Sequence, residues 1–267
     1  RYIYHENFKN HATPNVALMY KPGKFNFRAS YAAGFRTPTL SELYATDIAK
    51  KNDRLTIGNL DLKSEKNNYF SLSAEYVHER FSVSVNAFYN NIRDMIDYNT
   101  IATGDKAMEQ YGHKEVRQRD NIAEAKVHGI NVSANAYLGA GFNLSGGYTH
   151  LNTQDVELEQ PIDKSIKNAY NINAQWAHSW KIYRLNINLN GRINSKRFSK
   201  SYGYAPEYQL WDLNTRHSFN LKSVIIEPGC GMENLFDYMD DRPYNSNYAT
   251  LTPGRSFYIS LSLKFKS

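Results

Sequence analysis

Hydrophobic and polar residues alternate most regularly near the end of the chain, over residues 256–265. The large apolar residues there are Phe257, Ile259, Leu261, Leu263 and Phe265. The polar or amphipathic residues between them are Tyr258, Ser260, Ser262 and Lys264. Because successive side chains of a strand point to opposite faces, this segment predicts a β-strand with one apolar and one polar face. A soluble β-sandwich and a lipid-exposed β-barrel both contain strands of this kind.

Similar segments recur along the whole chain and predict about twelve strands of the length that a tilted membrane strand needs. The other predicted strands lie at 1–5, 14–20, 25–34, 70–76, 81–89, 130–138, 142–148, 170–176, 183–193, 208–221 and 224–234. Pro228 lies inside the last but one strand and predicts a bulge or a missing ladder hydrogen bond there. The chain is therefore expected to be all-β.

The connections between these strands alternate between short turns and long loops. The short turns lie near residues 22, 79, 140, 180 and 222. The long loops cover residues 6–13, 35–64, 95–120, 153–164, 197–207 and 235–253. Short turns at one end and long loops at the other are typical of antiparallel outer-membrane barrels, whose long loops lie outside the cell. This pattern predicts one domain over residues 1–267, an antiparallel transmembrane β-barrel.

One predicted strand has a polar face that distinguishes a barrel from a dry core. Five successive positions on that face carry Arg184, Asn186, Asn188, Asn190 and Arg192. A dry core does not satisfy so many polar groups, whereas a hydrated lumen or a polar plug does. A soluble sheet with one solvent-exposed face is the alternative.

Composition agrees with a barrel whose outer face alone is apolar. Hydrophobic residues make up 41% of the chain and mean hydropathy is −0.64, yet aromatic residues reach 14%. No stretch approaches the ~20 apolar residues that a membrane-spanning helix needs. The single cysteine, Cys230, excludes an internal disulfide. The net charge is +6, but the basic residues are scattered, with Lys50–Lys51 the longest run, so nucleic acid is not an expected partner.

Two stretches in the first half resemble motifs of TonB-dependent outer-membrane receptors. Gly34–Tyr44 is similar to the "GFRAPSLxELY" stretch of that family. Asn59–Glu65 resembles the following "NPxLxPE" box, with Leu60 and Ser64 in place of the usual prolines. The same residues also suit a purely structural role, because proline fixes a loop backbone and asparagine caps turns.

Three further stretches follow in the order that the family has them. Phe88–Ile96 is similar to "aFYNdIkDmI", Asn234–Asp237 matches "NLFD", and Pro253–Phe257 matches "PGRsF". The motif residues singled out by this resemblance are Phe35, Arg36, Pro38, Leu40, Leu43, Tyr44, Asn59, Leu62, Glu65, Asn234, Phe236, Pro253, Gly254 and Phe257.

The resemblance implies a barrel of roughly 22 strands around an N-terminal plug. Residues 1–267 would then be its C-terminal portion, with the plug and the first strands absent. The implied function is active import of a scarce chelate across the outer membrane of a Gram-negative bacterium, without catalysis and without a cofactor. The expected substrate is an iron complex, either a siderophore or haem, with cobalamin as the alternative. The implied partners are the TonB complex, through the plug, and outer-membrane lipid.

Candidate ligand-binding residues lie in the predicted long loops. They are Arg36, Tyr44, Tyr98, Tyr111, His113, Arg117, Tyr202 and Tyr204. Tyrosine rings stack on and hydrogen-bond to a chelate, but they are equally typical of the outer lipid boundary. Haem receptors of the family often carry a histidine between the two boxes, and residues 35–62 contain none. His113 is the substitute candidate, and a solvated loop histidine is the alternative. The acidic run Glu233, Asp237, Asp240 and Asp241 lacks calcium-site spacing, and no metal site is predicted.

Two other classes of barrel have a similar length. An outer-membrane phospholipase needs a lipid-facing serine beside a histidine. His128 lies on the predicted outward face of its strand, whereas Ser82, Ser84 and Ser145 lie on inward faces. An autotransporter translocator needs a helix ahead of its first strand. The family motifs favour the receptor over both.

Overall fold

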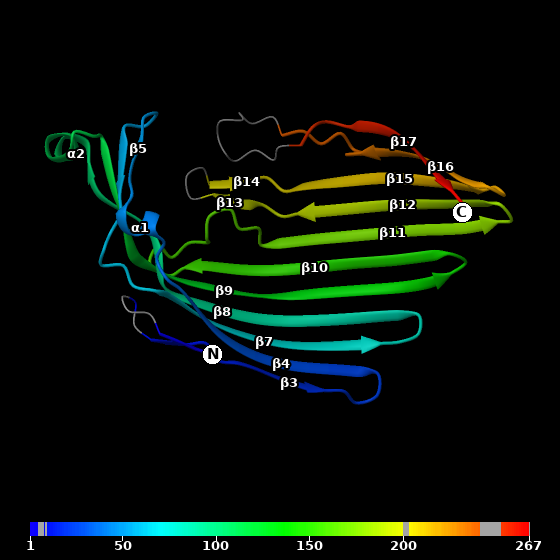
Figure 1. Ribbon diagram of the computed structural model, residues 1–267, viewed down its shortest axis with the longest axis horizontal. Helices are drawn as coiled ribbons and strands as arrows, with labels where there is room; N and C mark the ends of the chain where they lie inside the picture. The colour runs from blue at the N-terminus through cyan, green and yellow to red at the C-terminus, as the bar shows by residue number, and fades with distance from the viewer. Residues whose placement is uncertain (5–7, 9, 200–202, 241–251, 267) are drawn as a thin grey trace.

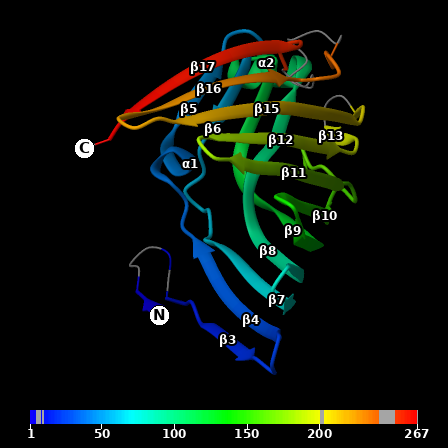
Figure 2. The same ribbon diagram turned by 90° about the vertical axis from the view of Figure 1, so that its right-hand side faces the viewer.

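The computed structural model describes residues 1–4, 8, 10–199, 203–240 and 252–266. In these residues, eleven antiparallel strands of a 13-stranded sheet follow one another in an open arc, with β3 and β17 at its two edges (Figures 1 and 2). Each strand pairs with its neighbours along the chain. The strands of the arc are β3 (Asn15–Tyr20), β4 (Phe25–Arg36), β7 (Glu65–Val77), β8 (Phe81–Thr103), β9 (Glu115–Gly139), β10 (Phe142–Asp155), β11 (Asn168–Trp180), β12 (Tyr183–Asn194), β15 (Tyr208–Asn220), β16 (Val224–Glu233) and β17 (Ser256–Phe265).

The apolar face of the arc is exposed over its whole length. On β17, Ile259 is 88% and Phe265 is 82% accessible, and Leu261 is exposed as well. A β-sandwich would bury these side chains between two stacked sheets, and among the residues that the structure describes no second sheet packs against this face. The predicted barrel wall is therefore confirmed.

Two rows of aromatic side chains border this apolar face. One row lies near the short turns, where Phe25 contacts Tyr76 and Trp180 contacts Tyr183. The other lies toward the long connections, and its ring pairs are Tyr31–Phe70, Tyr89–His128 and Tyr148–Tyr170. Aromatic rows on both sides of an apolar band are typical of the two lipid–water boundaries of a barrel.

The opposite face carries polar pairs that run across the strands. Ser30 hydrogen-bonds Ser71, with the two Oγ atoms 2.6 Å apart. Nδ2 of Asn173 donates to Oδ1 of both Asn188 and Asn190, each at 2.6 Å. These contacts place the predicted polar positions of β12 on one face, as a hydrated lumen requires.

The turns follow the predicted pattern. Ala140 and Lys181 adopt φ values of +48° and +46° at two of the short turns, and Gly23 adopts +59° at another. Opposite Pro228 the ladder between β15 and β16 is interrupted between the pairs Arg216–Gly229 and Phe219–Ile226. In the described part of the chain, no helix has both the length and the apolar character to cross a membrane.

Three predicted connections differ from the structure. Residues 95–120 are not a loop, because β8 continues to Thr103 and β9 begins at Glu115, with only helix α2 (Gly104–Tyr111) between them. The connection 35–64 contains helix α1 (Leu40–Tyr44) and the strands β5 (Thr46–Ala49) and β6 (Arg54–Ile57). The connection 197–207 contains a short hairpin of β13 (Arg197–Ser199) and β14 (Gly203–Ala205).

The first predicted strand is also shorter than expected. Of the predicted strand 1–5, the described residues 1–4 form only β1 (Tyr2–Ile3), which pairs with β2 (His11–Ala12) and lies outside the arc. The arc therefore has eleven of the expected twelve strands. Both segments of this pair are too polar and too short to span a membrane.

Candidate functional site

The candidate site lies at the end of the arc that carries the long connections. Helices α1 and α2 and the hairpin β5–β6 gather there, beyond the ends of the neighbouring strands (Figure 1). Strand β6 pairs in parallel with the first residues of β9, with Arg54 opposite Glu115 and Ile57 opposite Gln118. This pairing attaches the β5–β6 hairpin to the β8–β9 hairpin.

A small apolar cluster holds this attachment together. Ala102, Ala107 and Val116 are buried, and Leu55, Ile57, Ile101 and Tyr111 pack around them. Tyr111, a predicted ligand residue, is thus part of the packing between α2 and β9. The cluster makes the two hairpins one structural unit at this end of the sheet.

Helix α1 begins with a capping box that its sequence encodes. Oγ1 of Thr39 accepts a hydrogen bond from the backbone N–H of Glu42 at 3.2 Å. Oε2 of Glu42 accepts one from the backbone N–H of Thr39 at 2.8 Å. A threonine followed three residues later by glutamate satisfies two free N–H groups of the first turn.

Arg36 joins this helix to the sheet. Its Nε and Nη2 donate to the two carboxylate oxygens of Glu65, and its Nη1 and Nη2 donate to those of Glu42 at 2.8 and 3.1 Å. A guanidinium that forks onto two carboxylates is a strong, geometrically defined contact. The structure therefore commits most donors of Arg36, a predicted ligand residue, to a clamp between β4, α1 and β7.

The clamp changes the acidity of Glu42. Burial alone would raise the pKa of this carboxyl, but hydrogen bonds from Arg36 and Thr39 outweigh it and lower the pKa to about 2. Glu42 is thus ionised throughout the physiological range, as a partner of Arg36 must be.

The second family box is fixed by asparagine side chains. Oδ1 of Asn59 accepts the N–H of Asp61 at 2.9 Å, which forms a local turn. Asn121, on β9, accepts the N–H of Lys63 at 2.6 Å and donates to the carbonyl oxygens of Lys63 and Asp94. Leu62, in the same box, is buried. These contacts support the interpretation that Asn59–Glu65 shapes the loop.

The two C-terminal boxes close the ends of the last long connection. Nδ2 of Asn234 donates to the carbonyl oxygens of Tyr238 and Pro253 at 2.7 and 3.2 Å. Oδ1 of Asp237 accepts the N–H of Arg255 at 2.7 Å. The ring of Phe236 meets Trp211 edge-on, while Gly254 passes the Asp237 carboxylate. Asp237, from the acidic run, is thereby engaged by backbone, and Asp241 lies outside the described residues.

Four arginine and tyrosine side chains lie together on the β8–β9 hairpin and its β6 neighbour. Tyr98 lies opposite Arg119, whose guanidinium carbon is 3.6 Å from the centre of the Tyr98 ring. Arg117 lies two residues before Arg119 on the same face of β9. Arg54, on β6, pairs with Glu115 on β9. We call Arg54, Tyr98, Arg117 and Arg119 the arginine–tyrosine cluster.

One acidic side chain orients two members of this cluster. Glu115 accepts a hydrogen bond from Nε of Arg117 at 2.6 Å and forms a longer ion pair with Nη1 of Arg54 at 3.9 Å. The guanidinium of Arg119 contacts Tyr98 instead, so three guanidinium groups are balanced by this one carboxylate and the cluster keeps a net positive charge. Arg54 and Arg119 were missed in the sequence. If residues 115–120 had been predicted as a strand, Arg119 would have been placed on the same face as the candidate Arg117, because the two are two residues apart.

His113 lies at the tip of the same hairpin. Its Nδ1 is 2.9 Å from Oδ1 of Asp53, on the turn between β5 and β6. This hydrogen bond lowers the pKa of the Asp53 carboxyl below its ordinary value. A carboxylate that holds Nδ1 of a histidine fixes the ring and directs Nε2 outward.

The remaining candidates lie on other elements. Tyr44, at the end of α1, is exposed and lines a cavity of 860 Å³ between α1, residues 60–66 and β2. Tyr204, on β14, is exposed and meets the ring of Phe198 edge-on. Tyr202 lies outside the described residues. The structure thus brings Tyr98, Tyr111, His113 and Arg117 together and places Arg36, Tyr44 and Tyr204 elsewhere at the same end.

Comparison with known proteins identifies this architecture. The family model "TonB dependent receptor-like, beta-barrel" matches residues 1–235. The chain belongs to the TonB-dependent receptor family. This family consists of receptors and transporters of the Gram-negative outer membrane rather than enzymes, so the apolar face of the arc is its lipid-facing surface.

Solved structures share the fold at low sequence identity. A mutant of the ferric enterobactin receptor from Pseudomonas aeruginosa matches with a TM-score of 0.77 and 19% identity, over 99% of this chain and 41% of that one. The siderophore receptor PirA from the same organism gives 0.69 and 17%, over 98% and 44%. The ferric preacinetobactin receptor from Acinetobacter baumannii gives 0.68 and 18%, over 96% and 36%. The chain thus spans less than half the length of these receptors.

Proposed function

We propose that the receptor to which this chain belongs imports an iron–siderophore complex, and that the arginine–tyrosine cluster contacts it. The observation that carries this proposal is the gathering of three guanidinium groups and a phenol ring on one face at the end with the long connections. The similar solved receptors bear the names of siderophore receptors, which supports the same substrate class.

The chemistry of the cluster suits an anionic, aromatic chelate. Guanidinium groups pair with carboxylate and catecholate oxygens through parallel hydrogen bonds, and they stack on aromatic faces. The Tyr98 ring, already stacked on Arg119, adds an amphipathic surface. The net positive charge of the cluster also attracts an anionic complex from solution.

A second candidate substrate, haem, rests on a separate observation. Asp53 holds Nδ1 of His113, the arrangement in which a histidine presents Nε2 to a metal. Haem import predicts that His113 ligates iron, whereas siderophore import leaves this side chain a structural one. Cobalamin import, the other alternative, has no observation of its own.

The remaining parts of the proposal follow from the family. Energy for import would come from the TonB complex through an N-terminal plug, within a barrel of roughly 22 strands closed by further strands at β3 and β17. Residues 1–267 would be the C-terminal portion of that single barrel domain. The receptor would bind and transport its substrate without catalysis.

Ligand binding to the full-length receptor tests the proposal. Ferric enterobactin, ferric preacinetobactin, haemin and cyanocobalamin are titrated against the purified receptor and an Arg117→Gln/Arg119→Gln double variant. A control variant, Lys24→Gln/Lys222→Gln, removes two charges at the short turns. We expect a ferric siderophore to bind, with roughly 100-fold weaker affinity in the double variant and no change in the control. Equal affinity of the double variant would contradict the cluster, and haemin binding lost in His113→Ala would favour haem.

A further inference from the structure

The lumen-facing side of the sheet differs in charge from one part of the arc to another. The inward-facing residues in the middle of β8, β9, β10 and β11 are all uncharged. We call them the uncharged wall: Ser82, Ser84, Asn86, Phe88, Gly129, Asn131, Ser133, Asn135, Asn143, Ser145, Gly147, Thr149, Asn171, Asn173 and Gln175. The inward-facing positions of the other strands include Arg28, Glu75, Arg184, Arg192, Asp212, Arg216, Glu227, Glu233 and Lys264. Charge on the lumen face thus lies on either side of this wall.

The polar side chains of the uncharged wall hydrogen-bond to one another across the strands. The Oγ atoms of Ser84 and Ser133 are 2.7 Å apart, and Oγ1 of Thr149 donates to Oδ1 of Asn131 at 2.9 Å. Such neutral hydrogen bonds contribute little net free energy, because a ligand or water replaces them with bonds of the same kind. The wall can therefore bind a passing polar group and release it at small cost.

Two hollows follow one another along this wall. One has a volume of 410 Å³ and extends to the short turn at residues 78–80. The other has a volume of 380 Å³ and lies farther from that turn, with Gly147 in its lining. Both are lined by Asn135 and Ser145, so together they form one continuous trough. Glycine is needed at position 147, because a Cβ atom there would collide with the side chain of Asn171.

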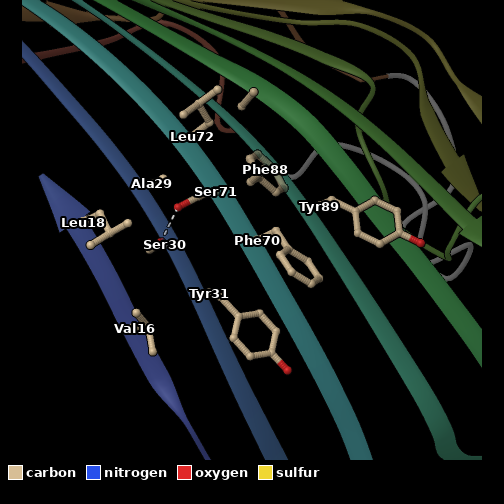
Figure 3. A pocket seen from close by; sticks show the side chains of 11 residues that line it. Val16, Leu18, Ala29, Ser30, Tyr31, Phe70, Ser71, Leu72, Phe88 and Tyr89 are labelled. Carbon is tan, nitrogen blue, oxygen red and sulfur yellow. Dashed lines mark hydrogen bonds between the residues drawn. The ribbon is translucent and has the colours of Figure 1, made fainter. Parts of the chain in front are cut away.

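An aromatic pair lies at the outer end of the trough. The rings of Tyr69 and Phe88 are stacked, with centroids 6.3 Å apart and an interplanar angle of 23°. Phe88 faces the lumen, whereas the next residue, Tyr89, belongs to the lipid-facing aromatic row, and Figure 3 shows the two side chains lying apart. Beyond this pair, β8 and β9 continue outward to Tyr98 and Arg119 of the arginine–tyrosine cluster. The cluster, the aromatic pair and the trough therefore follow one another along the same part of the sheet.

The neutrality of this wall suits transit better than retention. A permeation path needs several sites that bind strongly enough to admit a ligand and weakly enough to release it. Arginines on the charged walls, such as Arg28 and Arg192, would hold an anionic chelate through charge-assisted hydrogen bonds, which are roughly twice as strong as neutral ones. Carboxylates there, such as Glu75 and Glu227, would repel it.

We propose that the chelate crosses the lumen along the uncharged wall, from the Tyr69–Phe88 pair through the trough to the short turns. The aromatic pair would stack on the rings of the chelate, and the amide and hydroxyl groups of the trough would bind its oxygen atoms in succession. A polypeptide plug would form its ion pairs with the charged walls, so its displacement would open this wall most readily. This inference rests on the proposed import of an anionic chelate and names the surface along which it moves.

Import by the full-length receptor tests this path. Binding and uptake of ferric enterobactin are measured for Ser133→Arg, which fills the trough, and for Ser262→Arg, on the charged wall, as the matched control. We expect unchanged binding affinity in both, but saturated uptake at least roughly tenfold slower in Ser133→Arg than in the control. Ser133→Thr, which keeps the hydroxyl group, should import at the unmodified rate. Equal uptake by the two arginine variants would overturn the path, whereas an unmodified receptor that binds no ferric siderophore contradicts the proposed function.

Single cysteines test the path without relying on the arginine variants or on one chelate. In a Cys230→Ala background, Ser133→Cys and Ser262→Cys each replace one oxygen atom with sulfur, so both should fold. Each is labelled with a maleimide added outside the cell, in cells with and without TonB. We expect TonB to accelerate labelling of Ser133→Cys several-fold and to leave that of Ser262→Cys unchanged. The same ratio at both positions would show that the uncharged wall is not the one that opens.

Discussion

Arg36 and Glu42 form a two-pronged contact between the end of β4 and helix α1, with Nη1–Oε2 and Nη2–Oε1 distances of 2.8 and 3.1 Å. The same guanidinium also donates two hydrogen bonds to the carboxylate of Glu65 at the start of β7. Helix α1 has only five residues and no buried side chain of its own. An isolated helix of that length is unstable in water, so its position depends on contacts such as this one.

Replacing Arg36 with glutamine should therefore release α1 from the sheet. Four charge-assisted hydrogen bonds are lost, and we expect the local opening free energy of α1 to fall by about 1–3 kcal/mol. Amide hydrogen exchange at residues 40–44 measures this, with roughly tenfold or greater acceleration expected. Lys24→Gln, at a short turn, serves as the control. Exchange at α1 that stays unchanged in Arg36→Gln would show that the helix is held by other contacts.

The attachment of α1 should also depend on pH in a defined window. The folded pKa of Glu42 is about 2, below its ordinary value of 4.5, so the ionised carboxylate stabilises the folded form. That contribution is complete above pH 4.5 and is lost as the pH falls through about 2. Amide exchange at α1, corrected for its intrinsic pH dependence, should show protection falling between these values. Glu42→Gln should flatten the profile, and an unchanged profile would assign the transition to another group.

The faces of the arc were predictable because strand parity is a local property. Phe257 and Leu261 point to the lipid because they lie an even number of residues apart in a segment that is apolar on one face only. Pro228 likewise indicated a local interruption, which the ladder between β15 and β16 shows. In such segments, the alternation of apolar and polar residues directly reports which face meets lipid and which meets water.

The architecture of the candidate site was not predictable in this way. Residues 95–103 and 115–120 are strands that lie beyond the membrane, where both faces meet water or other loops, so no alternation marks them. The pairing of Arg54 with Glu115 joins distant segments in parallel, and nothing in either segment specifies the other. The role of Asn121 is similar, because an asparagine on a polar strand gives no sign that it bonds to Lys63.

Asn121→Ala should detach residues 58–64 from the β8–β9 hairpin. The asparagine makes three hydrogen bonds with backbone groups of Lys63 and Asp94 at 2.6–3.0 Å, and their loss should cost about 2–3 kcal/mol locally. Limited proteolysis of the loop in the full-length receptor provides the measurement, with faster cleavage expected between residues 58 and 64. Asn99→Ala, on the same hairpin, is the matched control, and equal cleavage of both variants would remove Asn121 from this role.

Val116→Ala should loosen the whole loop unit without affecting the barrel wall. Val116 is fully buried among Ala102, Ala107 and Tyr111, and removing two methyl groups there costs about 2 kcal/mol through lost burial and a small cavity. Amide exchange at β5 and β6 should accelerate more than tenfold, because the parallel pairing of β6 with β9 and the apolar cluster around Val116 are the main attachment of this hairpin. The hydrogen bonds that His113 and Lys114 make to Asp53 hold only its turn. Exchange in β10 and β11 provides the internal control, since those strands are held by ladders on both sides.

The same variant should weaken chelate binding if Arg54 acts together with Arg117, because Arg54 reaches Glu115 only while β6 stays paired with β9. Acceleration confined to α2, with β5 and β6 unchanged, would show that the parallel pairing alone holds the hairpin in place.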